Sequence, residues 1–187
     1  MSSFYDVDEL EEIGFQSVGT NVLVSKKASI YSPELMQIGN NVRIDDYCIL
    51  SGEISIGSYI HISAYSALYG RYRITLEDFT TISGRNIIYS ASDDYSGEYL
   101  TNPMLPEQYT NVSGGEVMIK KHSIIGAGCV IMPDLTIGEG TAIGAMSFVN
   151  HSTDPWGIYV GVPAKKIKDR KRDLLILENE LYQKIRC

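Results

Sequence analysis

The sequence predicts an all-β protein built as a solenoid of stacked, three-sided coils. Three observations support this prediction: an aliphatic residue returns every sixth position, a small residue often follows four positions later, and glycine often comes directly after the aliphatic residue. The period is neither the 2 of an ordinary strand nor the 3.6 of a helix. Three six-residue sides make a coil of about eighteen residues, and stacked coils form a β-solenoid.

The leading aliphatic residue of each hexad is expected to fill the interior of its coil. The six-residue repeat is interrupted by short offsets and by one long polar segment, and it resumes afterwards with the same period. These residues are Val18, Val24, Ile30, Ile38, Ile44, Leu50, Ile56, Ile62, Leu68, Ile74, Leu76, Ile82, Ile88, Ile119, Ile125, Ile131, Ile137, Ile143 and Val149. A chance origin for runs of this length is negligible, so the repeat is the strongest signal in the chain.

Small residues and glycines complete the hexads. Where space inside the coil is tight, the inward position four residues on is occupied by Ala28, Cys48, Ser66, Thr80, Ser123, Cys129, Thr141, Ser147 and Thr153. Cys48 and Cys129 are thereby interpreted as core fillers and not as nucleophiles. Corners that need a residue without Cβ are expected at Gly19, Gly39, Gly57, Gly126, Gly138 and Gly144.

Other segments flank or interrupt the coils within one domain, 1–187. Residues 1–17 form an N-terminal cap, in which "DVDELEEIG" predicts a short acidic helix that ends at Gly14. Coils are expected over 18–88 and 116–167, and the polar stretch 89–115 is expected to be an inserted active-site loop, because a loop this long is usually functional. Residues 168–187 predict an amphipathic C-terminal helix that caps the solenoid, with its apolar stripe on Leu174, Leu177, Leu181 and Ile185.

The composition of the chain limits the classes of partner that it is expected to bind. The 187 residues are 44% hydrophobic and carry a net charge of −7, which disfavours nucleic acid as a partner because the phosphate backbone requires a basic surface. No apolar run is long enough for a membrane span, and the acidic N-terminal residues do not resemble a signal peptide. Three scattered cysteines do not suggest a disulfide framework. We expect a cytoplasmic protein.

The stretch "IIGAGCVIMPDLTIGEGTAIGAMSFV", followed by "YVGVPAKKI", resembles the hexapeptide-repeat acyltransferases, whose fold is a left-handed parallel β-helix. The resemblance covers roughly 18–167. It implies acetyl-CoA as co-substrate, no metal, and a homotrimer with active sites at the subunit interfaces.

The resemblance also implies which residues bind CoA. In this family the pantetheine arm lies along the coils and contacts backbone at successive "IGxx" turns, here "IIGAG" and "AIGAM". A polar pair follows the next coil, and the dense basic run "KKIKDRKRD" corresponds to positions near the CoA phosphates. The implied cofactor-binding residues are Gly126, Ala127, Ala145, Asn150, His151, Lys165 and Lys168.

Two adjacent aspartates lie in the polar segment "YSASDDYSGEY", which interrupts the repeat. In the sugar acetyltransferases of this family a catalytic histidine ends the coil before the long loop, and Asp93 occupies that position here, with Asp94 beside it. A sugar hydroxyl needs a base with a near-neutral pKa, whereas an amine needs only to be delivered unprotonated. Either aspartate is therefore a candidate to bind an ammonium group and accept its proton, although a pair that merely caps a loop has the same sequence.

The loop "IYSASDDYSGEYLTNPMLPEQYTNVSGG" resembles that of dTDP-4-amino-4,6-dideoxyglucose N-acetyltransferases from O-antigen pathways. This resemblance implies an N-acetyltransferase that acts on a nucleotide-linked aminosugar. Tyr95, Tyr99 and Tyr109 are candidates to stack on a base or sugar, and His61 to line the cleft.

Three alternatives explain parts of the sequence. A sugar O-acetyltransferase of the same fold would use His61 or an aspartate as base. Zinc carbonic anhydrases share the solenoid but need two histidines close in sequence, whereas this chain has His61, His122 and His151 far apart. A non-enzymatic solenoid leaves "GVPAKK" and the long loop unexplained.

His122, beside two lysines at a predicted corner, is expected to be exposed.

Overall fold

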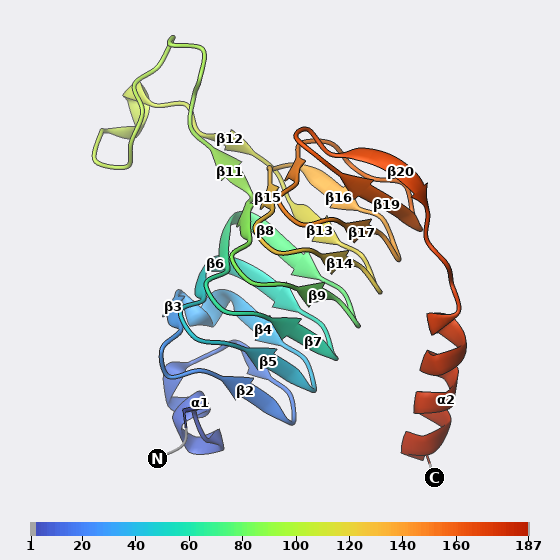
Figure 1. Ribbon diagram of the computed structural model, residues 1–187. Helices are drawn as coiled ribbons and strands as arrows, with labels where there is room; N and C mark the ends of the chain where they lie inside the picture. Colours follow the sequence, from blue (N-terminus) through green and yellow to red (C-terminus); the bar gives the residue numbers. More distant parts are fainter. Residues whose placement is uncertain (1–2, 187) are drawn as a thin grey trace.

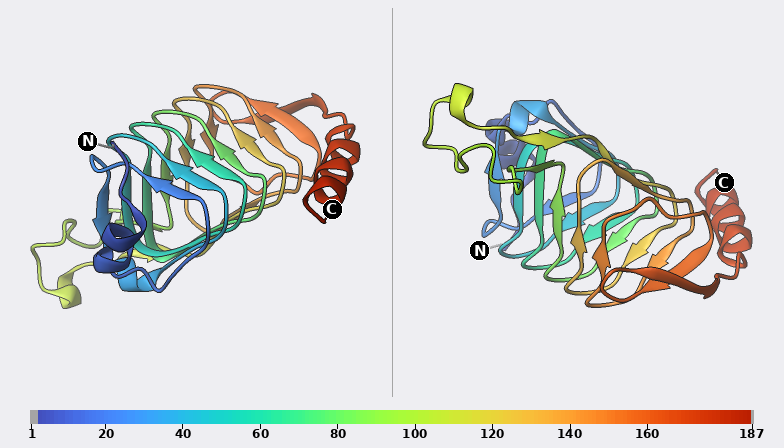
Figure 2. Two further views of the ribbon diagram at one scale, coloured as in Figure 1. Left: turned by 90° about the horizontal axis from the view of Figure 1, so that it is seen from below. Right: turned by 90° about the horizontal axis from the view of Figure 1, so that it is seen from above.

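The computed structural model describes residues 3–186 and shows a parallel β-helix of stacked three-sided coils. Figures 1 and 2 show the coils in order along one axis, with the N-terminal residues at one end and strand β20 at the other. The fold class predicted from the hexad repeat is confirmed. The parts of the predicted caps that fall on residues 1, 2 and 187 lie outside the described residues.

One side of the coils is a single eight-stranded sheet, here called the first face. Its strands stack in chain order and pair in parallel up to β19, while β20 pairs antiparallel with β19. The strands are β2 (Val22–Val24), β5 (Val42–Ile44), β7 (Ile60–Ile62), β9 (Thr81–Ile82), β14 (Ile124–Ile125), β17 (Ala142–Ile143), β19 (Gly157–Val160) and β20 (Lys165–Asp169).

A ten-stranded sheet forms the other two sides, because the long strands β6 (Ile49–Ile56) and β8 (Ala67–Leu76) turn the corner without a break. The second face continues from their first halves and the third face from their second halves. The second face adds β3 (Ser29–Tyr31), β10 (Ile87–Tyr89), β15 (Val130–Ile131) and β18 (Phe148–Val149). The third adds β1 (Ser17–Val18), β4 (Met36–Ile38), β13 (Val117–Ile119) and β16 (Leu135–Ile137). A 3₁₀ turn, η1 (Pro33–Leu35), precedes β4.

The predicted interior residues fill the core. From Ile38 to Val149, every leading aliphatic of the repeat is at most 3% exposed. Val18 departs from the prediction: it is 36% exposed, because it belongs to the first coil, beneath which no further coil packs. Cys48 and Cys129 are buried, and burial raises the pKa of both thiols, which agrees with their interpretation as core fillers.

Close coil stacking explains the corner glycines. A Cβ on Gly126 would lie 2.5 Å from the backbone nitrogen of Ala145 in the next coil. Left-handed corner positions, by contrast, are filled by larger residues, among them Tyr65 and Arg85 with φ of 62° each. The corner glycines are thus required by the spacing between coils, and not by their own backbone angles.

The buried polar residue Asn86 was not in the predicted series of small inward residues. Asn86 occupies the inward position between Ser66 and Cys129 and is fully buried. Its amide nitrogen donates to the Ser83 carbonyl at 2.6 Å, and its Oδ1 accepts the Cys129 N–H at 2.7 Å. This side chain joins two coils that are separated in sequence by the inserted loop.

The N-terminal helix α1 (Val7–Ile13) is confirmed. Asp6 caps its first turn by accepting the Glu9 N–H, while the Glu9 carboxylate accepts the Asp6 N–H. Gly14 ends the helix in the left-handed conformation, with φ of 84°.

The C-terminal segment differs from its prediction. Helix α2 (Leu174–Arg186) begins later than residue 168, because Lys165–Asp169 form β20 and close the last coil as a hairpin with β19. In Figures 1 and 2, α2 lies beside the coils and not across the end of the solenoid. The apolar stripe of α2 stays largely exposed, with Leu177 64% and Ile185 57% accessible.

The prediction that His122 is exposed is wrong. His122 is 6% exposed, its ring stacks 5.2 Å from that of Phe79, and its Nε2 lies 3.0 Å from a carboxylate oxygen of Glu178 on α2. Burial alone would raise the pKa of Glu178, but Lys121 and His122 together hold it below its usual range. Helix α2 therefore covers this corner and is held there by charge. Across residues 3–186, no helix is long and apolar enough to span a membrane.

Candidate active site

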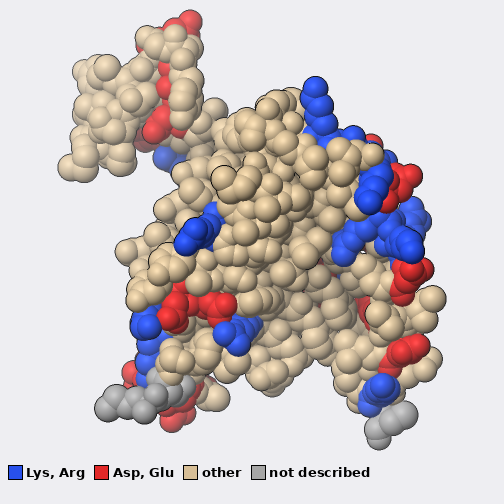
Figure 3. All heavy atoms as spheres, viewed as in Figure 1, with Lys and Arg blue, Asp and Glu red and all other residues tan. Residues whose placement is uncertain are grey.

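The inserted loop leaves the solenoid at the corner between the second and third faces. Its base is an antiparallel ribbon of β11 (Ala91–Ser92) and β12 (Ser113–Gly114), and its outer part contains the 3₁₀ turn η2 (Glu107–Tyr109). Figures 1 and 3 show the loop standing clear of the coils, with acidic side chains along it. Tyr95 and Met104 on the loop are 90% and 88% exposed.

Asp93 follows β11 directly and lies between two grooves. One, the arginine groove, has a volume of about 440 Å³ and is lined by Arg71 and by the loop residues Asn102, Leu105 and Glu107. The other, the apolar groove, measures about 670 Å³ and is lined by Tyr89, Val130, Met132, Phe148 and Tyr95. Ala91, Ser92 and Asp93 line both grooves. Both volumes fall within the usual range for small-molecule sites.

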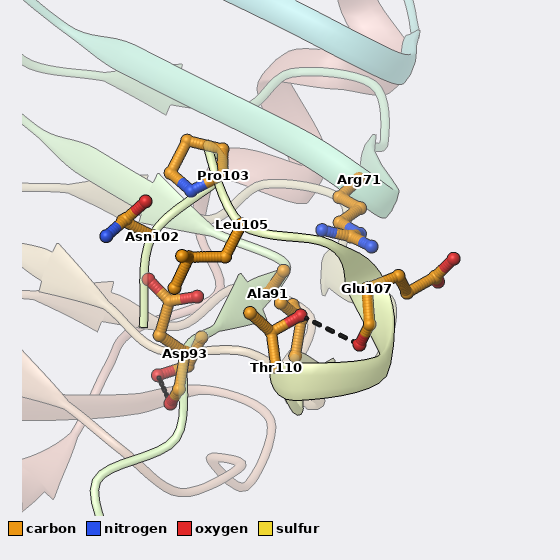
Figure 4. A pocket seen from close by; sticks show the side chains of 10 residues that line it. Arg71, Ala91, Asp93, Asn102, Pro103, Leu105, Glu107 and Thr110 are labelled. Atoms are coloured by element: carbon orange, nitrogen blue, oxygen red, sulfur yellow. Dashed lines mark hydrogen bonds between the residues drawn. The ribbon is translucent and has the colours of Figure 1, made fainter. Parts of the chain in front are cut away.

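Figure 4 shows the arginine groove, with the side chains of Arg71 and Asp93 reaching into it on either side of Ala91. The Glu107 carboxylate points away from the groove, while its carbonyl accepts the Thr110 hydroxyl at 3.2 Å. Over residues 3–186, neither a hydrogen bond nor an ion pair engages the Asp93 carboxylate or the Arg71 guanidinium; the Arg71 side chain lies 5.9 Å from the ring of Tyr72. Both charged groups are thus available to a ligand.

Asp94 has a different environment. Its carboxylate accepts the Ser96 hydroxyl at 2.9 Å and the Gly97 N–H at 3.0 Å. Burial alone would raise the pKa of Asp94, but these hydrogen bonds lower it. The Asp94 side chain therefore stabilises the turn at residues 94–97, a common function of aspartate in turns.

His61 lies on β7 of the first face, away from the ribbon. Its Nε2 is 2.7 Å from Asp45 Oδ2, and Asp45 also accepts the Arg43 Nε–H at 2.7 Å. Burial would raise the pKa of Asp45, but His61 and Arg43 hold it below its usual range. Within one chain the structure does not bring His61 together with Asp93.

The predicted CoA-binding turns lie at the corner between the first and second faces. Gly126 and Ala127 follow β14, Ala145 follows β17 one coil further on, and the Met146 N–H donates to the Ala127 carbonyl at 2.9 Å. Both alanine side chains are exposed. This corner presents small residues beside the exposed side chain of Met146, and the closeness of the coils is sufficient to explain Gly126.

The remaining predicted cofactor residues are dispersed. Asn150 and His151 follow β18, at the far end of the second face from Ala145, and both are exposed. Lys165 and Lys168 are exposed on β20. Figure 3 shows basic side chains gathered at this end of the molecule, over β19 and β20.

The three loop tyrosines do not share one site. Tyr95 lines the apolar groove beside Asp93. Tyr99 and Tyr109 belong to the outer part of the loop, where the Tyr109 carbonyl accepts the Leu100 N–H at 2.9 Å, and both are about half exposed. In the described range 3–186, no group of three or more His, Cys, Asp or Glu side chains is arranged to hold a metal ion.

Sequence reasoning missed Arg71, which lines the arginine groove with Asp93. A signal for Arg71 was present: between Arg85 and Lys120 the chain has no Lys or Arg, so any anion bound near the loop needs a cation from a neighbouring coil.

Comparisons with known proteins agree with this architecture. Residues 116–151 match the family described as bacterial transferase hexapeptide (six repeats). The chain is 47% identical over 180 residues to the dTDP-4-amino-4,6-dideoxy-D-glucose acyltransferase of Escherichia coli, which covers 95% of this chain and 94% of that protein. It is 58% identical to AntD, an N-acyltransferase from Bacillus cereus solved in complex with dTDP and 3-hydroxybutyryl-CoA, with a TM-score of 0.97 over 100% of both chains.

A second structure of AntD, a serine variant in complex with dTDP-4-amino-4,6-dideoxyglucose and coenzyme A, has a TM-score of 0.96 and covers 98% of this chain and 100% of that one. A third carries a substitution of the aspartate ten residues after that serine. The hexad repeat, the coil geometry and a relative that is 47% identical over nearly the whole length together show that the chain belongs to the bacterial hexapeptide transferase family.

Proposed function

We propose that this protein is an acyl-CoA-dependent N-acyltransferase that acylates the 4-amino group of dTDP-4-amino-4,6-dideoxyglucose, with acetyl-CoA as the expected donor. The E. coli relative is named as an acyltransferase of that sugar, and AntD has been solved with the same sugar and with CoA. The predicted place of the reaction, in O-antigen or other surface polysaccharide synthesis, rests on the loop resemblance.

The observation that carries the proposal is the position of Asp93 between the two grooves. A polar groove that contains the guanidinium of Arg71 suits the nucleotide sugar on one side, and an apolar groove on the other suits the acyl group and its thioester. A nucleophile and an acyl donor that enter from opposite sides meet where Ala91, Ser92 and Asp93 line both grooves, and Asp93 is the one of these three with a carboxylate. Holding two reactants in the right orientation in this way contributes to catalysis.

In the proposed reaction, the sugar amine attacks the thioester carbonyl, and the tetrahedral intermediate collapses with loss of CoA as its thiolate. Before the attack, Asp93 binds the substrate as an ammonium group through a charge-assisted hydrogen bond, accepts one proton from it to give the free amine, and passes that proton to solvent. After the attack the nitrogen loses a second proton, which passes through Asp93 to the thiolate. Backbone N–H groups of the coil are the candidate donors to the developing oxyanion.

Spacing supports Asp93 over Asp94. The serine and aspartate substituted in AntD are ten residues apart. In this chain Ser83 and Asp93 have that spacing, whereas the residue ten before Asp94 is Gly84. Asp94 retains its place in the proposal as the residue that holds the turn beside Asp93.

The test of the proposed function is an acyl-transfer assay that detects free CoA thiol. We expect turnover with dTDP-4-amino-4,6-dideoxyglucose and none with the analogue that carries a 4-hydroxyl group. Preferred turnover of the hydroxyl analogue would establish the O-acetyltransferase alternative instead. Acetyl-CoA and 3-hydroxybutyryl-CoA should be compared as donors, because the apolar groove has room for more than a methyl group.

The exposed lysines of β20 are proposed to bind the CoA phosphates. The double variant Lys165→Ala, Lys168→Ala should raise the KM for acyl-CoA with little change in kcat, because a phosphate contact is made equally in the ground and transition states. Steady-state kinetics with acyl-CoA varied at saturating sugar provide the measurement. A change confined to kcat would place the cofactor elsewhere. The proposed pantetheine contacts along the coils are Gly126, Ala127, Ala145, Asn150 and His151.

We propose a homotrimer in which each active site lies between subunits. The loop carries Tyr95, Met104 and Leu100 into solvent, and α2 exposes its apolar stripe, so a neighbour has surfaces to cover. Within one chain, moreover, Ser83 and Asp93 lie at opposite ends of β10, and His61 lies on another face. Light scattering at assay concentration should report three chains; a fully active monomer would refute the interface site.

A further inference from the structure

We propose that Arg71 is the binding residue for the diphosphate of the nucleotide sugar and that the arginine groove is its subsite. This inference rests on the proposed function and adds the group that recognises the nucleoside diphosphate. The groove has room for such a ligand, at about 440 Å³, and Arg71 and Asp93 both line it.

The charge around the loop singles out Arg71. From residue 86 to residue 119 the chain has no Lys or Arg, while the loop and its flanks carry Asp93, Asp94, Glu98, Glu107 and Glu116. A diphosphate placed beside Asp93 therefore meets a negative field unless a cation compensates it. A guanidinium group binds phosphate with two parallel N–H donors, which no lysine reproduces.

Neighbouring strand geometry directs Arg71 into the groove. The β6–β8 ladder shifts register after Gly52, at the corner where β8 carries Arg71. Two residues on, Arg73 has a φ of 79°, and its guanidinium lies 3.4 Å from Glu53 and 3.6 Å from Glu116. Arg73 is thus neutralised by carboxylates, and Arg71 retains its charge for a ligand.

The positions of Arg71 and Asp93 also determine how the substrate is oriented in the groove. With the diphosphate on Arg71 and the amine on Asp93, the sugar ring spans the distance between the two side chains, along the ribbon strand that carries Ala91. Arg71 is in this sense a specificity residue: it selects a sugar linked to a nucleoside diphosphate over a free aminosugar. The Glu107 carboxylate is directed away from the groove, so it does not occupy the space beside Arg71 that the anion would take.

The experiment is a calorimetric titration of the intact protein with dTDP, thymidine and CoA. We expect Arg71→Gln to weaken dTDP binding about tenfold or more, as for the loss of a charge-assisted phosphate contact, with thymidine and CoA affinities unchanged. Arg71→Lys should recover only part of the dTDP affinity. Arg73→Gln on the same strand is the matched control, with the same change of charge and wild-type affinity for dTDP.

Circular dichroism should show all variants folded, because Arg71 is exposed. Unchanged dTDP affinity in Arg71→Gln, or equal weakening in Arg73→Gln, would overturn the assignment of Arg71 while wild-type acyl transfer leaves the proposed function standing. Conversely, Arg71-dependent binding of dTDP without acyl transfer would refute the proposed function and retain the subsite. Absence of dTDP binding to the wild-type protein would overturn both.

Discussion

Replacing Asp93 by Asn is expected to lower kcat/KM for the aminosugar about a hundredfold at neutral pH. The expected loss lies at the low end for a general base, because an amine needs only to be deprotonated before attack and not during it. The neutral amide in place of the carboxylate would neither attract the ammonium group nor accept its proton. Initial rates with both substrates varied measure the effect.

Asp94→Asn is the matched control. Asp94 Oδ2 accepts both the Ser96 hydroxyl and the Gly97 N–H, at 3.0 Å each, so an amide oxygen in that place can keep both hydrogen bonds, and we expect a change of no more than a few fold. A loss in Asp94→Asn as large as that in Asp93→Asn would contradict the assignment.

The pH profile of the Asp93→Asn variant provides a second test. If Asp93 takes a proton from a bound ammonium group, raising the pH should partly restore the variant's rate, since solvent then delivers the free amine. A hydroxyl acceptor would show no such recovery, because its pKa lies far above the assay range. Near-normal rates for Asp93→Asn at neutral pH would show that the carboxylate only shapes the loop.

Asn86→Ala is expected to destabilise the protein by about 2–4 kcal/mol. The substitution leaves the buried Cys129 N–H without its acceptor and removes packed atoms from the interior. The Ser83 carbonyl keeps one partner, the Ser66 hydroxyl at 3.0 Å. The contact joins coils on either side of the inserted loop, so its loss should also disturb the corner that carries Ser83.

Cys48→Ala is the comparison for Asn86→Ala, because Cys48 is equally buried at the same inward position two coils earlier. It removes one sulfur atom and should cost only about 1 kcal/mol. Both should be measured as denaturant midpoints at one fixed chain concentration, since association affects apparent stability. Equal costs for the two variants would mean that the amide bridge contributes nothing specific.

The sequence by itself determined the architecture, because each coil repeats one local rule. A residue that returns every sixth position reaches the same inward position on each successive side of a triangular coil, and that position is equally buried at Ile44 on the first face and at Ile131 on the second. The signals that predict helix α1 are equally local, because its N-cap at Asp6 and its end at Gly14 directly flank the helix. The length of the interruption at 89–115 likewise predicted an inserted loop.

Only the tertiary structure decided the details of the candidate site, because they depend on contacts between segments distant in the chain. The pair at 93 and 94 looks symmetric in sequence, and the fold of the turn separates a carboxylate held by Ser96 from a free one. The exposure of His122 was mispredicted because a residue that contacts its ring, Glu178, lies 56 residues later in the chain. Arg71 meets Asp93 because one coil stacks on the next, and stacking brings together residues that no local pattern relates.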